Sequence, residues 1–107
     1  MNNSEINFHS AITILYVTDL AASLDYYKDK LGFKIDWGYQ SVFASVSRGS
    51  ATLMFCEGDQ GNPGSWVYIG VGNCDELFEE FVSNGADVKL PPTNYSWAKE
   101  IHVADPD

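Results

Sequence analysis

The sequence predicts an α+β domain built from two copies of one strand–helix module. Two apolar segments, 12–18 and 66–72, each end in a valine followed by a small residue. Asp19 and Asn73 come directly after these segments, and both residue types favour the N-cap of a helix. An amphipathic stretch that stops at a glycine follows each cap. A unit repeated twice within 107 residues predicts one domain made of two related halves.

The first half, about residues 11–57, reads as a strand, a helix and three further strands. The strand covers 11–18. The helix starts at Asp19, stops at Gly32, and carries one apolar stripe at spacings of four, three and four. The stripe consists of Leu20, Leu24, Tyr27 and Leu31. Residues 33–39, 42–48 and 51–57 then predict three strands, with a hairpin turn at Gly49. A short strand over 4–10 is a further possibility, because Ile6 and Phe8 alternate with polar residues.

The second half, about residues 65–107, follows a hinge at 58–64 that is rich in glycine and polar residues. A strand is expected at 65–72, then a helix capped by Asn73 and Glu76. The helix should bury Leu77, Phe78, Phe81 and Val82. A short strand at 86–90 should end at the prolines that follow it, and 97–104 should form a last strand. This half is therefore expected to lack the final strand of the module.

Strand alternation separates two faces in each half. Leu15 and Val17, like Val67, Ile69 and Val71, should pack under the helices. The opposite faces should carry a mixture of aromatic, thioether, carboxylate and imidazole groups, which is typical of a pocket lining. These residues are Ile12, Ile14, Tyr16, Met54, Cys56, Trp66, Tyr68, Glu100 and His102. Trp37 and Tyr39 share the parity of core-directed residues, and should face the core unless their strand twists or bulges.

The composition narrows the class of partner. Fifteen acidic residues oppose six basic ones, giving a formal net charge of −9. This balance disfavours nucleic acid as a partner, because phosphate contacts need clustered Lys and Arg. It also suits cationic small molecules, but taken alone it is better explained by simple solubility. No apolar run is long enough to cross a membrane, and the first nine residues do not resemble a secretion signal. Cys56 and Cys74 are expected to be free thiols in a cytoplasmic protein.

Three segments resemble the vicinal oxygen chelate superfamily, which includes glyoxalase I, extradiol dioxygenases and bleomycin-resistance proteins. The segments are 15–33 (LYVTDLAASLDYYKDKLGF), 63–68 (PGSWVY) and 102–107 (HVADPD). The resemblance implies paired βαβββ modules whose sheets curl around a cleft, usually completed in a dimer. It is more specific for the fold than for the activity, because this fold hosts several chemistries.

The resemblance also implies where catalytic members hold a metal ion. The matching positions are Ile12, Trp66 and, on the fourth strand, Met54. Ile and Trp cannot ligate a divalent cation, and a thioether does not suit hard or borderline ions. We therefore expect no metal site, no cofactor and no metal-dependent catalytic residues. Glu100 and His102 share a strand face, but two such groups alone are a weak signal for a metal.

The sequence thus favours a metal-free binding protein similar to the bleomycin-resistance members. Its ligand would be a cationic or aromatic compound, such as an antibiotic, held by stacking and cation–π contacts. The candidate ligand-binding residues are Tyr16, Met54, Trp66, Tyr68, Glu100 and His102. The alternative is a metal-dependent lyase, isomerase or dioxygenase of the glyoxalase type. A third possibility is an interaction module with neither function. We expect a homodimer. In one version of this dimer, each subunit donates segment 4–10 as a strand to its partner.

Overall fold

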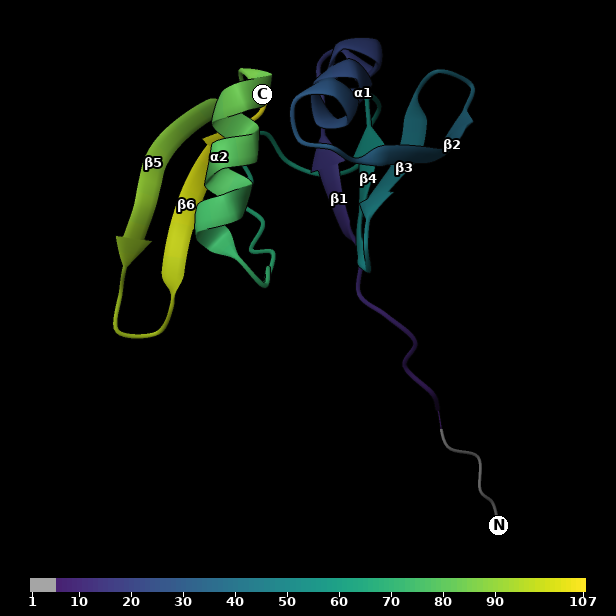
Figure 1. Ribbon diagram of the computed structural model, residues 1–107. Coiled ribbons are helices and arrows are strands. Elements are labelled where there is room, and N and C mark those ends of the chain that lie inside the picture. The colour runs from purple at the N-terminus through teal and green to yellow at the C-terminus, as the bar shows by residue number, and fades with distance from the viewer. Residues whose placement is uncertain (1–5) are drawn as a thin grey trace.

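The computed structural model describes residues 6–107 and confirms the order of elements in the first half. A four-stranded sheet contains β1 (Thr13–Tyr16), β2 (Lys34–Tyr39), β3 (Phe43–Arg48) and β4 (Ala51–Cys56). Its strand order is β1-β4-β3-β2, with β1 parallel to β4 and the other pairs antiparallel. Helix α1 (Leu20–Asp29) covers one face of this sheet (Figure 1).

The predicted signals at both ends of α1 are confirmed. The Asp19 carboxylate accepts a hydrogen bond from the Ala22 backbone N–H at 3.0 Å, which caps the helix. Gly32 lies beyond the helix with φ of +76°, a conformation that favours glycine. A Cβ at this position would also lie 2.7 Å from Nη1 of Arg48. Gly32 thus allows the chain to turn while the Arg48 side chain passes close to its backbone.

The second half contains α2 (Cys74–Asn84), β5 (Asp87–Asn94) and β6 (Lys99–Ala104), with β5 and β6 paired antiparallel. The prediction that the prolines at 91 and 92 end the first of these strands is wrong. The strand continues through them, with a shift in register between Leu90 and Thr93. Proline is tolerated on an edge strand where its missing N–H faces away from the partner. The last strand begins at Lys99 rather than at Trp97, because residues 95–98 form the turn closed by Tyr95 N–H on Ala98 C=O.

The predicted strand at 65–72 is not formed. This segment has no regular secondary structure and no strand pairs with it in the part of the chain that the structure describes. A strand needs a hydrogen-bonded neighbour, and β5 and β6 pair only with each other. Val67 is partly buried against the core as expected, whereas Ile69 and Val71 are exposed, contrary to prediction.

The N-terminal segment also differs from the strand considered for it. Residues 6–10 form no strand, and the side chains of Ile6 and Phe8 are 87% and 96% exposed. Figure 1 shows this segment extending away from the folded body. Ser4 and Glu5, which the expected strand included, lie outside the described residues.

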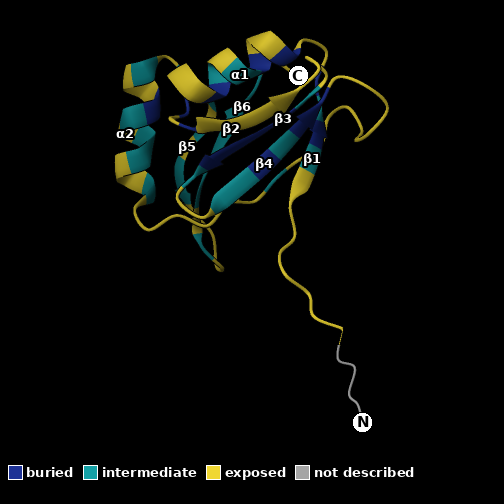
Figure 2. Cartoon of the chain, turned by 90° about the vertical axis from the view of Figure 1, so that its right-hand side faces the viewer, coloured by how far each residue is buried: buried dark blue, intermediate teal, exposed yellow. Residues whose placement is uncertain are grey.

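Both halves contribute to one hydrophobic core (Figure 2). Phe81 of α2 is buried together with Leu15, Val17 and Phe55 of the first half. Side chains from α2, β5 and β6 pack against the same cluster, namely Leu77, Val88, Ile101 and Val103. Val82 was expected on the buried face of α2 but is 52% exposed. The core therefore lies on the face of the sheet that α1 covers, and the second half packs against the same core.

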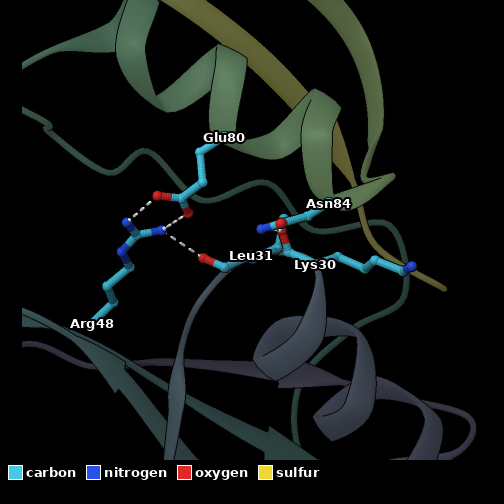
Figure 3. A network of polar contacts seen from close by, with 5 residues as sticks. All are labelled: Lys30, Leu31, Arg48, Glu80 and Asn84. Carbon is cyan, nitrogen blue, oxygen red and sulfur yellow. Dashed lines mark hydrogen bonds and ion pairs between the residues drawn. The ribbon is translucent and has the colours of Figure 1, made fainter.

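Polar contacts also join the two halves. Figure 3 shows the guanidinium of Arg48 on β3 between Glu80 of α2 and the backbone carbonyl of Leu31. Arg48 donates to both carboxylate oxygens of Glu80, at 2.5 and 2.8 Å, and to Leu31 C=O at 2.9 Å. The Asn84 amide donates to Lys30 C=O at 3.2 Å. The C-terminal ends of α1 and α2 are thereby held together.

Two tyrosines of α1 hold the end of β6 and the segment that follows it. The Tyr26 hydroxyl donates to Ala104 C=O at 2.6 Å and accepts from Asp87 N–H at 2.9 Å. The Tyr27 hydroxyl donates to the Asp105 carboxylate at 2.8 Å. Burial, followed by the nearby Asp105 charge, raises the pKa of Tyr27 far above its ordinary value, so this phenol stays neutral.

Among the described residues, no helix is long and apolar enough to span a membrane.

Candidate ligand-binding surfaces

The face of the four-stranded sheet opposite α1, called here the open face, carries the aromatic and thioether side chains predicted for the first half. Register pairs Ile14 with Met54 and Tyr16 with Cys56 across β1 and β4, and Ser45 with Met54 across β3 and β4. The alternate residues Leu15, Val46, Leu53 and Phe55 are buried in the core. The alternation predicted for β1 and β4 is therefore confirmed.

A β-bulge in β2 reverses the side-chain parity of that strand. Ile35 pairs with Val46 on the core side, but Trp37, not Asp36, pairs with Ser45 on the open face. One extra residue in a strand leaves two consecutive side chains on the same face. The bulge thus directs both Asp36 and Trp37 to the open face. Tyr39 pairs with Phe43 and follows the same parity. Trp37 and Tyr39 were expected to face the core unless their strand twists or bulges, and the bulge in β2 is that exception.

The bulged strand forms one wall of an open hollow of about 540 Å³. Its lining consists of Trp37, Gly38, Tyr39, Val42, Phe43, Cys56, Gly58, Asp59 and Gln60. The rings of Trp37 and Phe43 are stacked with centroids 5.9 Å apart and planes inclined by 7°. Side chains of Trp37 and Tyr39 remain 45% and 59% exposed. The hollow therefore presents aromatic rings to solvent, and it is open rather than enclosed.

A carboxylate lies beside these rings. Asp36 accepts hydrogen bonds from the hydroxyls of Ser47 at 2.9 Å and Ser45 at 3.4 Å. The ammonium of Lys34 is 3.9 Å from Asp36, and this lysine side chain is 79% exposed, so the ion pair is weak. The two serines fix the Asp36 carboxylate on the open face without cancelling its charge.

A second group of side chains, called here the hairpin cluster, comes from β6, the turn before it and the irregular segment before α2. It consists of Trp66, Trp97, Glu100 and His102. One carboxylate oxygen of Glu100 contacts His102 Nε2 at 3.0 Å, and the other accepts from Trp97 Nε1 at 2.8 Å. The ring of Trp66 lies edge-on to His102, with centroids 5.3 Å apart. The hydrogen bond from Trp97, and next that of His102, lowers the pKa of Glu100.

Five of the six residues predicted to bind ligand lie on these two surfaces, and Tyr68 lies on neither. Trp66, Glu100 and His102 are in contact in the hairpin cluster. Tyr16 and Met54 lie on adjacent strands of the open face, and Tyr68 is 71% exposed in the segment before α2. Within residues 6–107, no hydrogen bond or ring contact joins the two groups. Because Ile101 and Val103 pack against the core shared with the sheet, Glu100 and His102 point away from it on the far side.

Sequence reasoning placed the lining of the hollow incompletely. Alternation assigns no role to Phe43, and it directs Trp37 and Tyr39 to the core unless their strand twists or bulges. The missing information was the bulge, which strict alternation cannot reveal. The one signal available is the glycine in the run Ile-Asp-Trp-Gly-Tyr, because a glycine inside a strand often marks a bulge.

The residues at the metal positions implied by the family do not fit a metal ion. Ile12 and Trp66 offer no ligand atom, and Met54 lies between Ile14 and Ser45 across the adjacent strands. No group of three or more His, Cys, Asp or Glu side chains able to hold a metal occurs among residues 6–107. Cys56 and Cys74 are free thiols, as expected.

Solved structures similar to this chain share its fold. A bleomycin-binding protein from Streptomyces verticillus, solved with copper(II)-bleomycin, is 24% identical with a TM-score of 0.80. The match covers 95% of this chain and 91% of that one. TioX from Micromonospora sp. ML1 is 19% identical with a TM-score of 0.69, covering 92% and 88% of the two chains. A lactoylglutathione lyase from Agrobacterium tumefaciens is 18% identical with a TM-score of 0.66, covering 95% and 89%.

No curated protein sequence matches the chain significantly. A family model for the glyoxalase/bleomycin resistance protein/dioxygenase superfamily matches residues 9–107. The match spans both halves, including the open face and the hairpin cluster. This chain therefore belongs to the glyoxalase/bleomycin resistance protein/dioxygenase superfamily.

Proposed function

We propose that this protein binds a flat cationic or aromatic small molecule, such as an antibiotic, and sequesters it without metal-dependent chemistry. The observation that carries the proposal is the hollow of about 540 Å³ with the stacked Trp37–Phe43 pair in its wall. Stacking on exposed rings stabilises a flat ligand by about 0.5–1.5 kcal/mol per ring pair. A binding protein needs such affinity alone, whereas a catalyst needs groups that act on the bound molecule.

Charge supports a cationic ligand. Asp59 lines the hollow, Asp36 lies next to Trp37 on the open face, and Glu100 lies in the hairpin cluster. A cation near an aromatic face gains further stabilisation of about 0.5–2 kcal/mol. The net charge of −9 also accelerates the encounter with cations. Among the similar structures, the bleomycin-binding protein holds copper(II)-bleomycin, which illustrates the class of ligand that this fold accommodates.

We further propose that the working form is a homodimer, in which the hairpin cluster of one subunit completes the open face of the other. The two surfaces lie on different sides of the shared core within one chain, so a second copy is needed to bring them together. Ile6 and Phe8 are free to contact such a partner, either by packing or as an exchanged strand. The free thiols of Cys56 and Cys74 suit a cytoplasmic location.

The three tryptophans of the chain allow a direct test of this proposal. Trp37 reports on the hollow, and Trp66 and Trp97 report on the hairpin cluster. Bleomycin is titrated into the wild type and into variants that keep one tryptophan, the others being replaced by Phe. We expect quenching of both Trp37 and Trp66, with Trp66→Ala and Trp37→Ala each raising the Kd roughly tenfold.

Two controls decide the result. Val82→Ala removes an exposed apolar side chain of α2 that belongs to neither surface, and it should leave the Kd within about twofold. Sedimentation should show a dimer. Unchanged affinity of both Trp37→Ala and Trp66→Ala would refute the assigned surfaces. Stoichiometric zinc, nickel, manganese or iron in the purified protein would instead favour an enzyme of the glyoxalase type.

A further inference from the structure

One carboxylate lines the hollow together with its aromatic rings. Asp59 is exposed and shares the lining with the stacked pair Trp37 and Phe43 and with Tyr39. Among the described residues, Asp59 takes part in no ion pair, and no lysine or arginine lines the hollow. The hollow therefore combines exposed rings with a carboxylate that no neighbouring basic side chain neutralises.

The loop that carries Asp59 is held on both sides of this residue. Before it, the Gly58 N–H donates to Sγ of Cys56, which also lines the hollow, at 3.2 Å. After it, Gly61 passes so close to β1 that a Cβ there would lie 2.8 Å from the backbone nitrogen of Tyr16. These contacts hold the loop beside the hollow before any ligand binds, so that binding orders little further backbone.

The two other carboxylates in this part of the chain are engaged elsewhere. Glu57 precedes the loop, but its carboxylate accepts from the Leu20 N–H at the start of α1 at 2.7 Å. Asp36 is held by two serine hydroxyls on the open face and lies 3.9 Å from the ammonium of Lys34. Neither Glu57 nor Asp36 lines the hollow. Asp59 is thus the carboxylate that a ligand in the hollow would meet.

We infer that Asp59 makes the hollow selective for cations, as the counter-ion of a flat organic cation whose ring stacks on Trp37. Stacking on the indole stabilises charged and neutral rings alike, whereas the carboxylate stabilises only a positive charge. Asp59 therefore determines the charge of the preferred ligand, and Trp37 determines its shape. The inference rests on the proposed function, since it names the residue that selects the ligand class at one of the proposed surfaces.

The dyes 10-methylacridinium and acridine test the inference, because they have nearly the same shape and only the first is charged at pH 7.5. Their Kd values are measured by fluorescence at low ionic strength for the wild type, Asp59→Asn and Asp25→Asn. Asp25→Asn is the matched control, because it removes the same charge from an exposed position on α1. We expect Asp59→Asn to raise the Kd of 10-methylacridinium about threefold and to leave that of acridine within about 1.5-fold. Asp25→Asn should leave both Kd values within about 1.5-fold, and Trp37→Ala should raise both.

The possible outcomes separate the inference from the proposed function. Unchanged affinity of Asp59→Asn for 10-methylacridinium, or an equal loss for both dyes, would overturn the role of Asp59. An equal loss in Asp25→Asn, or a larger one in Asp36→Asn, would also overturn it, because the general field or another carboxylate would then select the charge. In each of these cases, weaker binding of both dyes to Trp37→Ala would leave the binding function standing. No binding of either dye or of bleomycin would overturn the inference and the proposed function together.

Discussion

At the scale of single residues, Arg48 joins β3 to α2 and to the residues after α1, and no sequence pattern predicts these contacts. Its guanidinium forms two hydrogen bonds with Glu80 and one with the carbonyl of Leu31. This bidentate geometry suits Arg and cannot be reproduced by Lys. Because Arg48 and Glu80 are each more than one-third exposed, solvent screens their attraction, and the hydrogen bond to the backbone contributes a comparable share.

We expect Arg48→Ala to lower the free energy of unfolding by about 1–2 kcal/mol at pH 7. The exposed ion pair contributes about 0.2–1 kcal/mol, and the lost hydrogen bond to Leu31 about 1 kcal/mol. Urea unfolding measures the change. Lys89→Ala is the matched control, because it removes only an exposed pair with Asp87 and should cost less than about 0.5 kcal/mol.

The same contact predicts a dependence on pH. The hydrogen bond from Arg48 lowers the pKa of Glu80 in the folded protein. A carboxyl whose pKa is depressed by folding adds stability above its unfolded pKa of about 4.3, and this stability disappears as pH falls through the folded value. The stability difference between the wild type and Glu80→Gln should therefore be largest near neutral pH and shrink below about pH 4. A difference that grows with acidity would contradict this role of Glu80.

At the scale of elements, the helices were predicted well because their signals are local. Asn73 accepts from Glu76 N–H at 3.0 Å, and Gly85 ends α2 with φ of +79°. The strand predicted at 65–72 is not formed because a strand needs a hydrogen-bonded neighbouring strand. Hydrophobic alternation does not reveal whether such a neighbour is present. The continuation of β5 through two prolines was missed for a related reason, since tolerance of proline depends on which edge of the sheet it occupies.

We expect Asn73→Ala to destabilise the protein by about 1 kcal/mol. The substitution leaves the Glu76 N–H without its partner and removes the side-chain contact between Asn73 and Glu76. Thermal or urea unfolding followed by circular dichroism measures the effect. Glu79→Ala is the control on the exposed side of α2, and it should change stability by less than about 0.5 kcal/mol. Equal effects of the two substitutions would show that the cap does not stabilise α2.

The candidate surfaces also combine features with local sequence signals and features that depend on the rest of the fold. The parity of β1, β4 and β6 was predictable because these strands alternate regularly. The lining of the hollow was not, because one extra residue in β2 moves Trp37 and Tyr39 to the other face. The separation of Met54 from Trp66 could not be predicted either, since it depends on how the two halves share one core. The division of the chain at 58–64 into two modules stays a prediction.

At the scale of the whole molecule, charge repulsion opposes the compact state. With a net charge of −9, the protein should become more stable as salt screens like charges. The screening length falls from about 30 Å at 0.01 M to about 8 Å at 0.15 M ionic strength. We expect the midpoint of thermal unfolding to rise by about 4 °C over this interval, which corresponds to roughly 1 kcal/mol. A fall in the midpoint would mean that the ion pairs outweigh the general repulsion.

The bulge in β2 affects how mutation can change the chemistry of the open face. A regular strand never places two successive side chains side by side, yet here the Asp36 carboxylate and the Trp37 indole are adjacent on the open face. Deleting Asp36 would leave a regular ladder and keep every ring, while one carboxylate would leave the open face. A single codon can thus change the charge of this face without changing the fold.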